Sequence, residues 1–193
     1  MSHPIQYQVP LLRKLAAREE IDLTVYFFWD FGIKETKDPE FGQNVKWDIP
    51  ILEGYKYKFI KNYAKNPSSS FFGQLNFGVI RELFRNKYDA VLLYGWNSFP
   101  NWLAFFFAPL VGTKIILTGE SPLSQELKKS KLILAVKSVV LRVIFWLSSA
   151  IMYIGKENKK FYEFYGVSEN KLFFMPYAVE NDRFIGEKNK LSG

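Results

Sequence analysis

The chain alternates short apolar runs with longer segments in which apolar residues recur every three or four positions. The first pattern is typical of buried parallel strands, and the second is typical of helices that pack on a sheet. The run KIILT at residues 114–118 is a clear example of the first pattern. The strands or extended segments expected from these runs are residues 21–28, 51–60, 90–94, 114–118, 150–153 and 172–175.

Helices are expected between most of these strands. Pro10 suits the first turn of the first helix, while Gly112 and Gly166 follow the ends of two later ones. The expected helices are residues 10–20, 76–85, 102–110, 129–148 and 157–165. Loops are expected at residues 29–48 and 62–72. Because strands and helices alternate, we expect an α/β protein with a parallel sheet.

The order of the elements predicts a Rossmann-like, three-layer arrangement that lacks its first strand. In a doubly wound fold a central strand normally precedes the first helix, but no strand pattern precedes Ser2. At the other end, residues 181–193 are polar and rich in Lys and Gly, which is typical of a linker. We therefore predict one domain over residues 1–180, followed by the start of an interdomain linker at 181–193.

The helix expected at 129–148 has a narrow polar side. Its stretch LILAVKSVVLRVIFWL is too short for a membrane span and contains Lys137 and Arg142. The polar positions that share one stripe are Lys131, Ser138, Arg142 and Ser149. The pattern favours a mostly buried helix. The alternative is a helix in a membrane interface, with Lys131 and Arg142 facing lipid phosphates.

Charge and composition exclude several classes of protein. The net charge is +7, but the basic residues are dispersed and no nucleic-acid-binding motif is present. With no Cys and one His, the sequence has no disulfide framework, no thiolate metal site and no two-His zinc site. Neither G-x-G-x-x-G, a P-loop nor G-x-S-x-G occurs. We expect no metal or cofactor, and a cytoplasmic location, with the inner face of the membrane as a further possibility.

Polar and aromatic residues collect in the loops that follow expected strands or precede the first helix. Ligands of open α/β sheets bind beyond the carboxyl ends of the strands, so these loops are expected to form one rim. The candidate residues are His3, Gln6, Tyr7, Trp96, Asn97, Gly119, Glu120 and Ser121. Each also has a purely structural interpretation: His3 as a helix cap, Trp96 as packing on the sheet edge, Glu120 as a surface carboxylate.

Four segments together resemble family 4 glycosyltransferases. Two are the run from Ser2 to Leu12 and the run KWDIPILEGY at residues 46–55. The third is Y-I-G-x-x-N-x-x-F-Y-x-x-Y-G-V at 153–167, similar to the last helix of the amino-terminal half of such enzymes. The fourth is K-L-F-F-x-P-Y-x-V-x-N-x-x-F at 171–184, which looks like the stretch that leads into the interdomain linker.

The resemblance implies the amino-terminal, acceptor-side half of a GT-B enzyme, in which two Rossmann-like domains face each other across a cleft. Such enzymes retain anomeric configuration, usually need no metal, and take a nucleotide sugar as co-substrate. By position, His3, Gln6 and Tyr7 border the donor phosphates and acceptor, while Trp96 and Asn97 line the acceptor pocket. Glu120 falls where related enzymes place a polar cleft residue, often His, near the acceptor hydroxyl, and is the candidate catalytic residue.

The sequence departs from the family in having Glu at position 120 and in lacking the paired-glutamate E-x7-E motif of the donor domain. We therefore expect this polypeptide alone to have no transferase activity, and detectable transfer by it would refute that expectation. The expected acceptor is a glycan or a lipid-linked molecule, with peripheral membrane contact and no nucleic acid. The main alternative is a non-catalytic Rossmann-like module that binds a partner or a membrane surface. A nucleotide-dependent enzyme of another class is a third.

Overall fold

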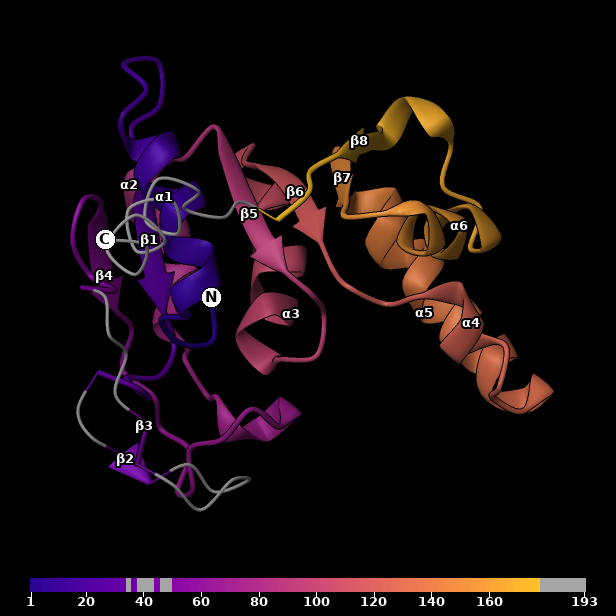
Figure 1. Ribbon diagram of the computed structural model, residues 1–193, viewed down its shortest axis with the longest axis horizontal. Coiled ribbons are helices and arrows are strands. Elements are labelled where there is room, and N and C mark those ends of the chain that lie inside the picture. Colours follow the sequence, from indigo (N-terminus) through magenta and orange to yellow (C-terminus); the bar gives the residue numbers. More distant parts are fainter. Residues whose placement is uncertain (34–35, 38–43, 46–49, 178–193) are drawn as a thin grey trace, which may run out of the picture. The chain divides into compact units, whose positions relative to one another are not determined.

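The computed structural model describes residues 1–33, 36–37, 44–45 and 50–177 (Figure 1). The chain forms two compact units, each described here by itself. The central unit comprises Met1–Ser2 and Ile60–Pro176, and the amino-terminal unit comprises His3–Phe59 together with Tyr177. The expected loop at 29–48 lies partly, and the linker at 181–193 wholly, outside the described residues. The single domain predicted over 1–180 stays a prediction.

The described part of the central unit is built on a parallel sheet with the order β5-β6-β7-β8. The strands are β5 (Ala90–Tyr94), β6 (Lys114–Thr118), β7 (Ala150–Tyr153) and β8 (Leu172–Phe174). Leu93, Leu117 and Ile151 are almost fully buried, as their apolar runs predict. The α/β class and the parallel pairing are therefore confirmed, and the arrangement is Rossmann-like. The absent first strand stays a prediction.

Helices connect these strands, and Figure 1 shows α4, α5 and α6 grouped beside β7 and β8. The α-helices of the unit are α2 (Gly78–Asn86), α3 (Phe99–Phe107), α4 (Leu123–Glu126), α5 (Lys131–Leu147) and α6 (Lys156–Phe164). Short 3-10 turns are η2 (Phe71–Gly73), η3 (Pro109–Val111) and η4 (Glu169–Lys171). Aromatic side chains of α6 and of the residue after it form much of the core, since Phe161, Tyr162 and Tyr165 are 2% exposed or less.

Two helix predictions in this unit need correction. Helix α3 begins three residues earlier than expected, because Ser98 is extended and Pro100 occupies the first turn. Helix α4 was not expected, since a four-residue element shows no periodicity.

Residues 60–76, part of which was predicted to be a turn or flexible loop, are joined by hydrogen bonds. Asn62 donates to the Gly73 carbonyl at 2.9 Å and accepts from the Leu75 amide at 2.8 Å.

The amino-terminal unit pairs β1 with β4 in parallel, from Thr24 opposite Lys56 to Phe27 opposite Phe59. Its elements are η1 (Gln6–Gln8), α1 (Val9–Ala16), β1 (Thr24–Phe27), β2 (Thr36–Lys37), β3 (Asn44–Val45) and β4 (Lys56–Phe59). β2 and β3 form a short antiparallel pair inside the expected loop. Arg13 holds the segment before β4 against α1, donating to the carbonyls of Glu53 at 3.0 Å and Pro50 at 2.7 Å.

Helix α1 is shorter than the predicted 10–20. The Arg18 amide bonds to the Leu15 carbonyl and the Ile21 amide to the Arg18 carbonyl, so the chain tightens into turns after Ala16. Residues 17–20 are all exposed and offer no apolar face to pack, which removes the usual reason for continuing a helix.

Helix α5 is the largest departure from expectation. The sequence favoured a mostly buried helix, but only Leu141, Ile144 and Phe145 are buried in it. A broad apolar side is exposed instead, with Leu132 and Trp146 about three-quarters accessible. The spacing of the polar residues showed that the polar stripe of α5 is narrow. It did not show which part of the apolar surface packs against the rest of the central unit.

Candidate functional site

The carboxyl ends of β5, β6 and β7 lie next to one another in the central unit. Tyr94 pairs with Thr118, which pairs in turn with Met152. The Gly95 amide donates to the Thr118 carbonyl at 2.6 Å, so the loop after β5 turns directly onto β6. Gly95 has φ +70°, in the left-handed region that suits glycine. The loops that follow these three strands are thus brought together at their starting points, and two of them carry predicted site residues.

Buried polar side chains from the helices hold these loops in place. Asn101 of α3 donates to the carbonyls of both Tyr94 and Gly95 at 2.9 Å. Asn158 of α6 donates to the Ser121 carbonyl at 3.0 Å and accepts from the Ile154 amide at 3.1 Å. Both asparagines are 4% exposed. The amide of each therefore ties together backbone groups that would otherwise lack fixed partners.

These supporting residues were not predicted as site residues. Asn158 was visible only as part of the family-like segment at 153–167, and Asn101 gave no signal. The sequence does not show that either asparagine is buried, and burial is what requires each amide to find partners nearby.

Gly119 is packed between two aromatic side chains. A Cβ atom at this position would lie 3.2 Å from Trp96 Cζ3 and 3.2 Å from the Tyr162 hydroxyl. Tyr162 donates to the Gly119 carbonyl at 3.2 Å. The Trp96 ring stacks on Phe161 at a centroid distance of 5.9 Å and an angle of 3°. Trp96 is half-buried and therefore serves packing as well as bordering the loops.

The loops present polar side chains to solvent. Asn97 and Glu120 are exposed, and Ser121 is half-buried. Burial raises the pKa of the Tyr162 hydroxyl above its ordinary value, and the negative charge of Glu120 adds to this rise. A carboxylate, an amide and a hydroxyl together offer both acceptors and donors, the combination that binds neighbouring hydroxyl groups of a ligand.

His3 lies in the amino-terminal unit beside the residues that follow β1. Its ring meets Trp29 at 5.9 Å and Phe31 at 5.4 Å, edge-on in both cases. Trp29 and Phe31 stack on each other at 4.6 Å. Burial lowers the pKa of His3 below its ordinary value, which favours the neutral imidazole.

Gln6 and Tyr7 belong to η1 of the same unit. Gln6 is half-buried, and Tyr7 is exposed with its ring edge-on to Tyr177 at 5.5 Å. The predicted site residues therefore fall into two groups, one in each unit. A single rim that includes both groups stays a prediction.

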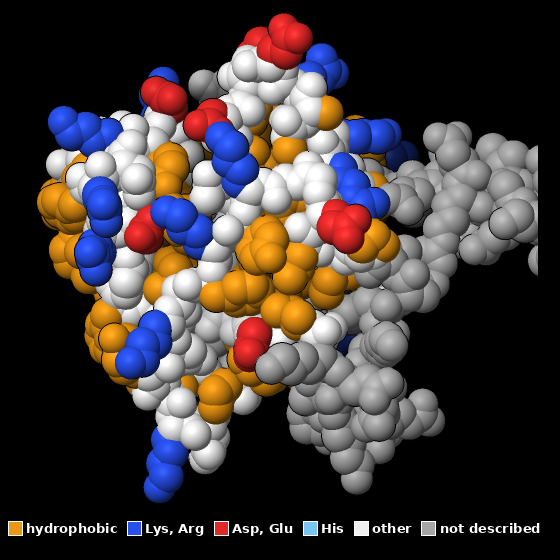
Figure 2. Space-filling view, turned by 90° about the vertical axis from the view of Figure 1, so that its left-hand side faces the viewer, with side chains coloured by type: hydrophobic (Ala, Val, Ile, Leu, Met, Phe, Trp, Pro, Cys, Tyr) orange, Lys and Arg blue, Asp and Glu red, His pale blue; other side chains and the backbone are white. Residues whose placement is uncertain are grey.

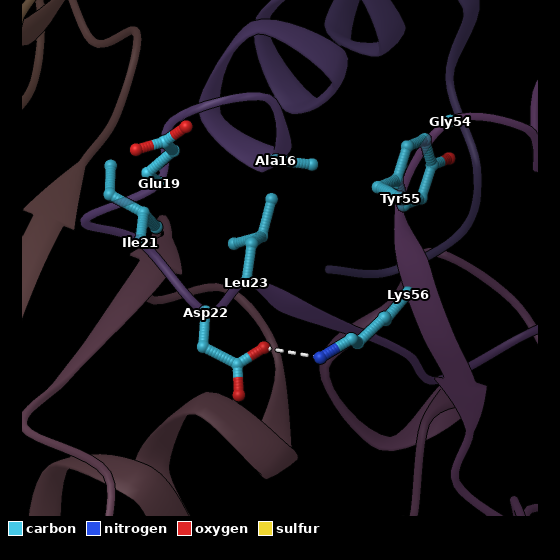
Figure 3. Close-up of a pocket in the computed structure, with 8 residues that line it drawn as sticks. All are labelled: Ala16, Glu19, Ile21, Asp22, Leu23, Gly54, Tyr55 and Lys56. Atoms are coloured by element: carbon cyan, nitrogen blue, oxygen red, sulfur yellow. Dashed lines mark hydrogen bonds and ion pairs between the residues drawn. The ribbon is translucent and has the colours of Figure 1, made fainter.

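A pocket of about 420 Å³ lies elsewhere in the amino-terminal unit (Figure 3). Figure 3 shows Ala16 between Glu19 and Tyr55, with the Asp22–Lys56 ion pair of 2.5 Å below them. The pocket adjoins the amino ends of β1 and β4. Ligands of parallel α/β sheets bind at the opposite, carboxyl ends, and the ion pair is largely exposed, so we give this pocket no catalytic role.

Basic side chains are dispersed over the surface, and the described residues hold no metal-binding group. Figure 2 shows lysine and arginine side chains scattered over one face, which agrees with the dispersed basic residues of the sequence. Among the described residues, no three His, Asp or Glu side chains are grouped in a way that could hold a metal ion.

The chain was also compared with known proteins. Comparisons with family models, curated proteins and solved structures found no match.

Proposed function

We propose that this chain is the acceptor-binding side of a retaining glycosyltransferase, which moves a sugar from a nucleotide sugar to a glycan or a lipid-linked acceptor. The observation that carries the proposal is the cluster of loops after β5, β6 and β7. Exposed Asn97 and Glu120 lie on loops whose backbone is fixed from beneath by Asn101, Asn158 and Tyr162. When the backbone of a binding site is already fixed, less of the binding free energy is lost to ordering the protein.

The resemblance of four segments to family 4 glycosyltransferases supports the same assignment. One of the three loops lies in those segments, since residues 153–156 begin the third segment, and Asn158, which holds the loop after β6, belongs to it as well. The polar groups of the cluster are hydroxyl-binding groups, which suits a sugar or another polyol better than an apolar ligand.

The chemistry assigned to the chain is orientation of the acceptor. In the transfer, the bond between the anomeric carbon and the diphosphate oxygen breaks, and a bond from that carbon to the acceptor oxygen forms. The hydroxyl proton leaves with the diphosphate. Glu120 accepts a hydrogen bond from the acceptor and so fixes the direction of its reacting oxygen, while Asn97 and Ser121 bind adjacent hydroxyls. Stabilisation of the leaving diphosphate is assigned to the donor-binding domain of such enzymes.

A glycan array tests the proposal. The labelled chain is expected to bind a restricted set of glycans, and Glu120→Gln should weaken that binding about tenfold or more, because a charge-assisted hydrogen bond contributes roughly 1.5–3 kcal/mol. Glu20→Gln is the matched control, since Glu20 is exposed and lies far along the chain from these loops. Binding that is equally strong in both variants, or absent for every glycan, would count against an acceptor site here. A non-catalytic module would then explain the fold better.

A further inference from the structure

Helix α5 carries an exposed apolar stripe along its whole length. Its residues are Leu132, Val136, Val139, Val143 and Trp146, spaced by four, three, four and three positions, so they lie on one side of the helix. Each is between 49% and 76% exposed. Ile133 and Val140 widen the stripe on one flank. Monomeric proteins rarely expose so continuous an apolar surface unless it binds something.

The opposite side of α5 is fixed to the central unit. Phe145 packs edge-on against Tyr162 at 5.3 Å and against Tyr165 at 6.3 Å. At the end of the helix, the Lys171 ammonium donates to the Ser148 carbonyl at 2.9 Å. The apolar stripe is therefore held outward by packing on its back, and in Figure 1 the start of α5 projects beyond α6.

The charged residues of α5 itself are all positive. Lys131 and Arg142 are exposed on its second flank, and Lys128 and Lys129 precede the helix. No Asp or Glu occurs between residues 127 and 156. The neighbouring Glu126 is 3% exposed and is held by ion pairs with Lys129 and Lys137. Lys137 therefore faces the protein, and Lys131 and Arg142 are the residues that face solvent.

The basic residues beside the stripe favour an anionic bilayer over a second copy of this chain as the partner of this surface. Two copies of α5 packed along the stripe would place basic side chains of both copies together without an acidic partner on either helix. An anionic bilayer supplies phosphates for the basic flank and an acyl boundary for the apolar stripe. Within the described part of the chain, no helix has the length and apolar character needed to cross a bilayer.

We propose that α5 docks this chain on an anionic lipid bilayer, with the apolar stripe at the acyl boundary and Lys131 and Arg142 at the level of the phosphates. The geometry is that of an interfacial helix, in which long basic side chains extend from the flank toward the headgroups. Docking does not depend on the chain's being part of a glycosyltransferase, and loss of glycan binding in Glu120→Gln would leave it unaffected.

Flotation with vesicles tests the docking. The chain should float with phosphatidylcholine vesicles that contain phosphatidylglycerol, and much less with phosphatidylcholine alone. The double variant Leu132→Gln, Val139→Gln should lose about tenfold or more in partitioning, because two apolar side chains no longer leave water. The double variant Lys131→Glu, Arg142→Glu should lose about as much, and added salt should weaken the wild type.

Matched controls are available at equally exposed positions. Leu110→Gln and Phe72→Gln change apolar side chains that are 71% and 67% exposed. The double variant Lys65→Glu, Arg85→Glu changes the charge by the same amount at exposed sites. All of these variants alter solvent-facing side chains, so their circular dichroism spectra should match that of the wild type. The control variants should float like the wild type.

A second readout locates the contact. Brominated lipids should quench tryptophan fluorescence in the wild type, and Trp146→Phe should remove most of that quenching while leaving flotation largely intact. Docking by α5 would be overturned by any of three results: no flotation, flotation unaffected by either α5 double variant, or quenching that persists without Trp146. Concentration-dependent dimers that the α5 variants abolish would assign the stripe to a second copy instead.

Discussion

The hydroxyl of Tyr165 donates a hydrogen bond of 2.6 Å to Glu126 Oε1, and this contact joins α6 to the short helix α4. The same carboxylate accepts from Lys129 at 2.9 Å, and from Lys137 at 2.8 Å through Oε1 and 2.7 Å through Oε2. Its side chain is 3% exposed. A buried charge with this many partners fixes the beginning of α5 relative to α6 and so determines which face of α5 is exposed.

Glu126→Gln should destabilise the chain by about 3 kcal/mol, because breaking a buried ion pair leaves the buried part of Lys137 without its counter-charge. Chemical denaturation of the two proteins measures this. Glu163→Gln is the control: that residue pairs with Lys159 at 3.5 Å in a more exposed setting, where such a pair contributes roughly 0–1 kcal/mol. Equal losses of unfolding free energy in the two variants would show that the ion pairs of Glu126 contribute no more to stability than a more exposed pair does.

The stability difference between the wild type and Glu126→Gln should depend on pH. Burial acts to raise the pKa of Glu126, but hydrogen bonds from Lys137, Tyr165 and Lys129 hold it below the ordinary 4.5. The unfolded chain therefore binds this proton at higher pH than the folded chain does. The contribution is present above about pH 4.5 and is lost as the pH falls through the folded-state pKa. Urea denaturation should give the same difference in the free energy of unfolding between the two proteins at pH 7 and pH 5, and a smaller difference at lower pH. A difference that widens on acidification would contradict the role given to Glu126.

Much of the fold follows from the sequence, because strands buried on both faces are continuous apolar runs. The bounds of β5, β6 and β7 agree with prediction, and in β5 and β6 a glycine directly follows the run. The role of Glu126 was not predictable in this way. Its partner Tyr165 is 39 residues further along the chain, and no local pattern marks a carboxylate that folding will bury.

The candidate site was predictable to a similar extent. The rule that loops after parallel strands gather at one edge predicted that the loops after β5, β6 and β7 begin side by side, and the strand pairing confirms this. A common site formed by Asn97, Glu120 and Ser121 stays a prediction. The asparagines that hold these loops were missed because the sequence does not show that Asn101 and Asn158 are buried, and for Asn158 one of the bound groups, the Ser121 carbonyl, is 37 residues away. Trp96 was assigned to a ligand pocket, while the structure also packs it on Phe161.

Gly119→Ala should destabilise the chain by about 1–2 kcal/mol, because the added Cβ falls 3.2 Å from atoms of Trp96 and Tyr162 that are themselves packed. It should also weaken glycan binding by moving Glu120. Gly155→Ala is the matched control, since a Cβ there meets nothing within 4 Å, and its cost as a cap residue should stay below about 1 kcal/mol. Thermal unfolding of both variants measures the difference. A larger loss in Gly155→Ala would refute the tight packing at Gly119.

Asn158→Leu should cost about 2–4 kcal/mol, because it leaves the Ser121 carbonyl and the Ile154 amide without their side-chain partner in a buried place. Asn170→Leu, at an exposed position, is the control and should change stability by less than about 1 kcal/mol. Hydrogen exchange at the Ile154 amide gives a local readout, which should accelerate in Asn158→Leu and remain slow in the control. Unchanged exchange there would mean that Asn158 does not hold the loop.

We propose above all that the loops after β5, β6 and β7 bind an acceptor sugar. The most direct measurement is an amide NMR titration of the isotope-labelled chain with the glycan that it binds best on the array. We predict shift changes concentrated at Gly95–Asn97 and Gly119–Ser121, which Glu120→Gln reduces and Glu20→Gln does not. Shift changes confined to other residues, or identical titrations for the two variants, would contradict an acceptor site in these loops.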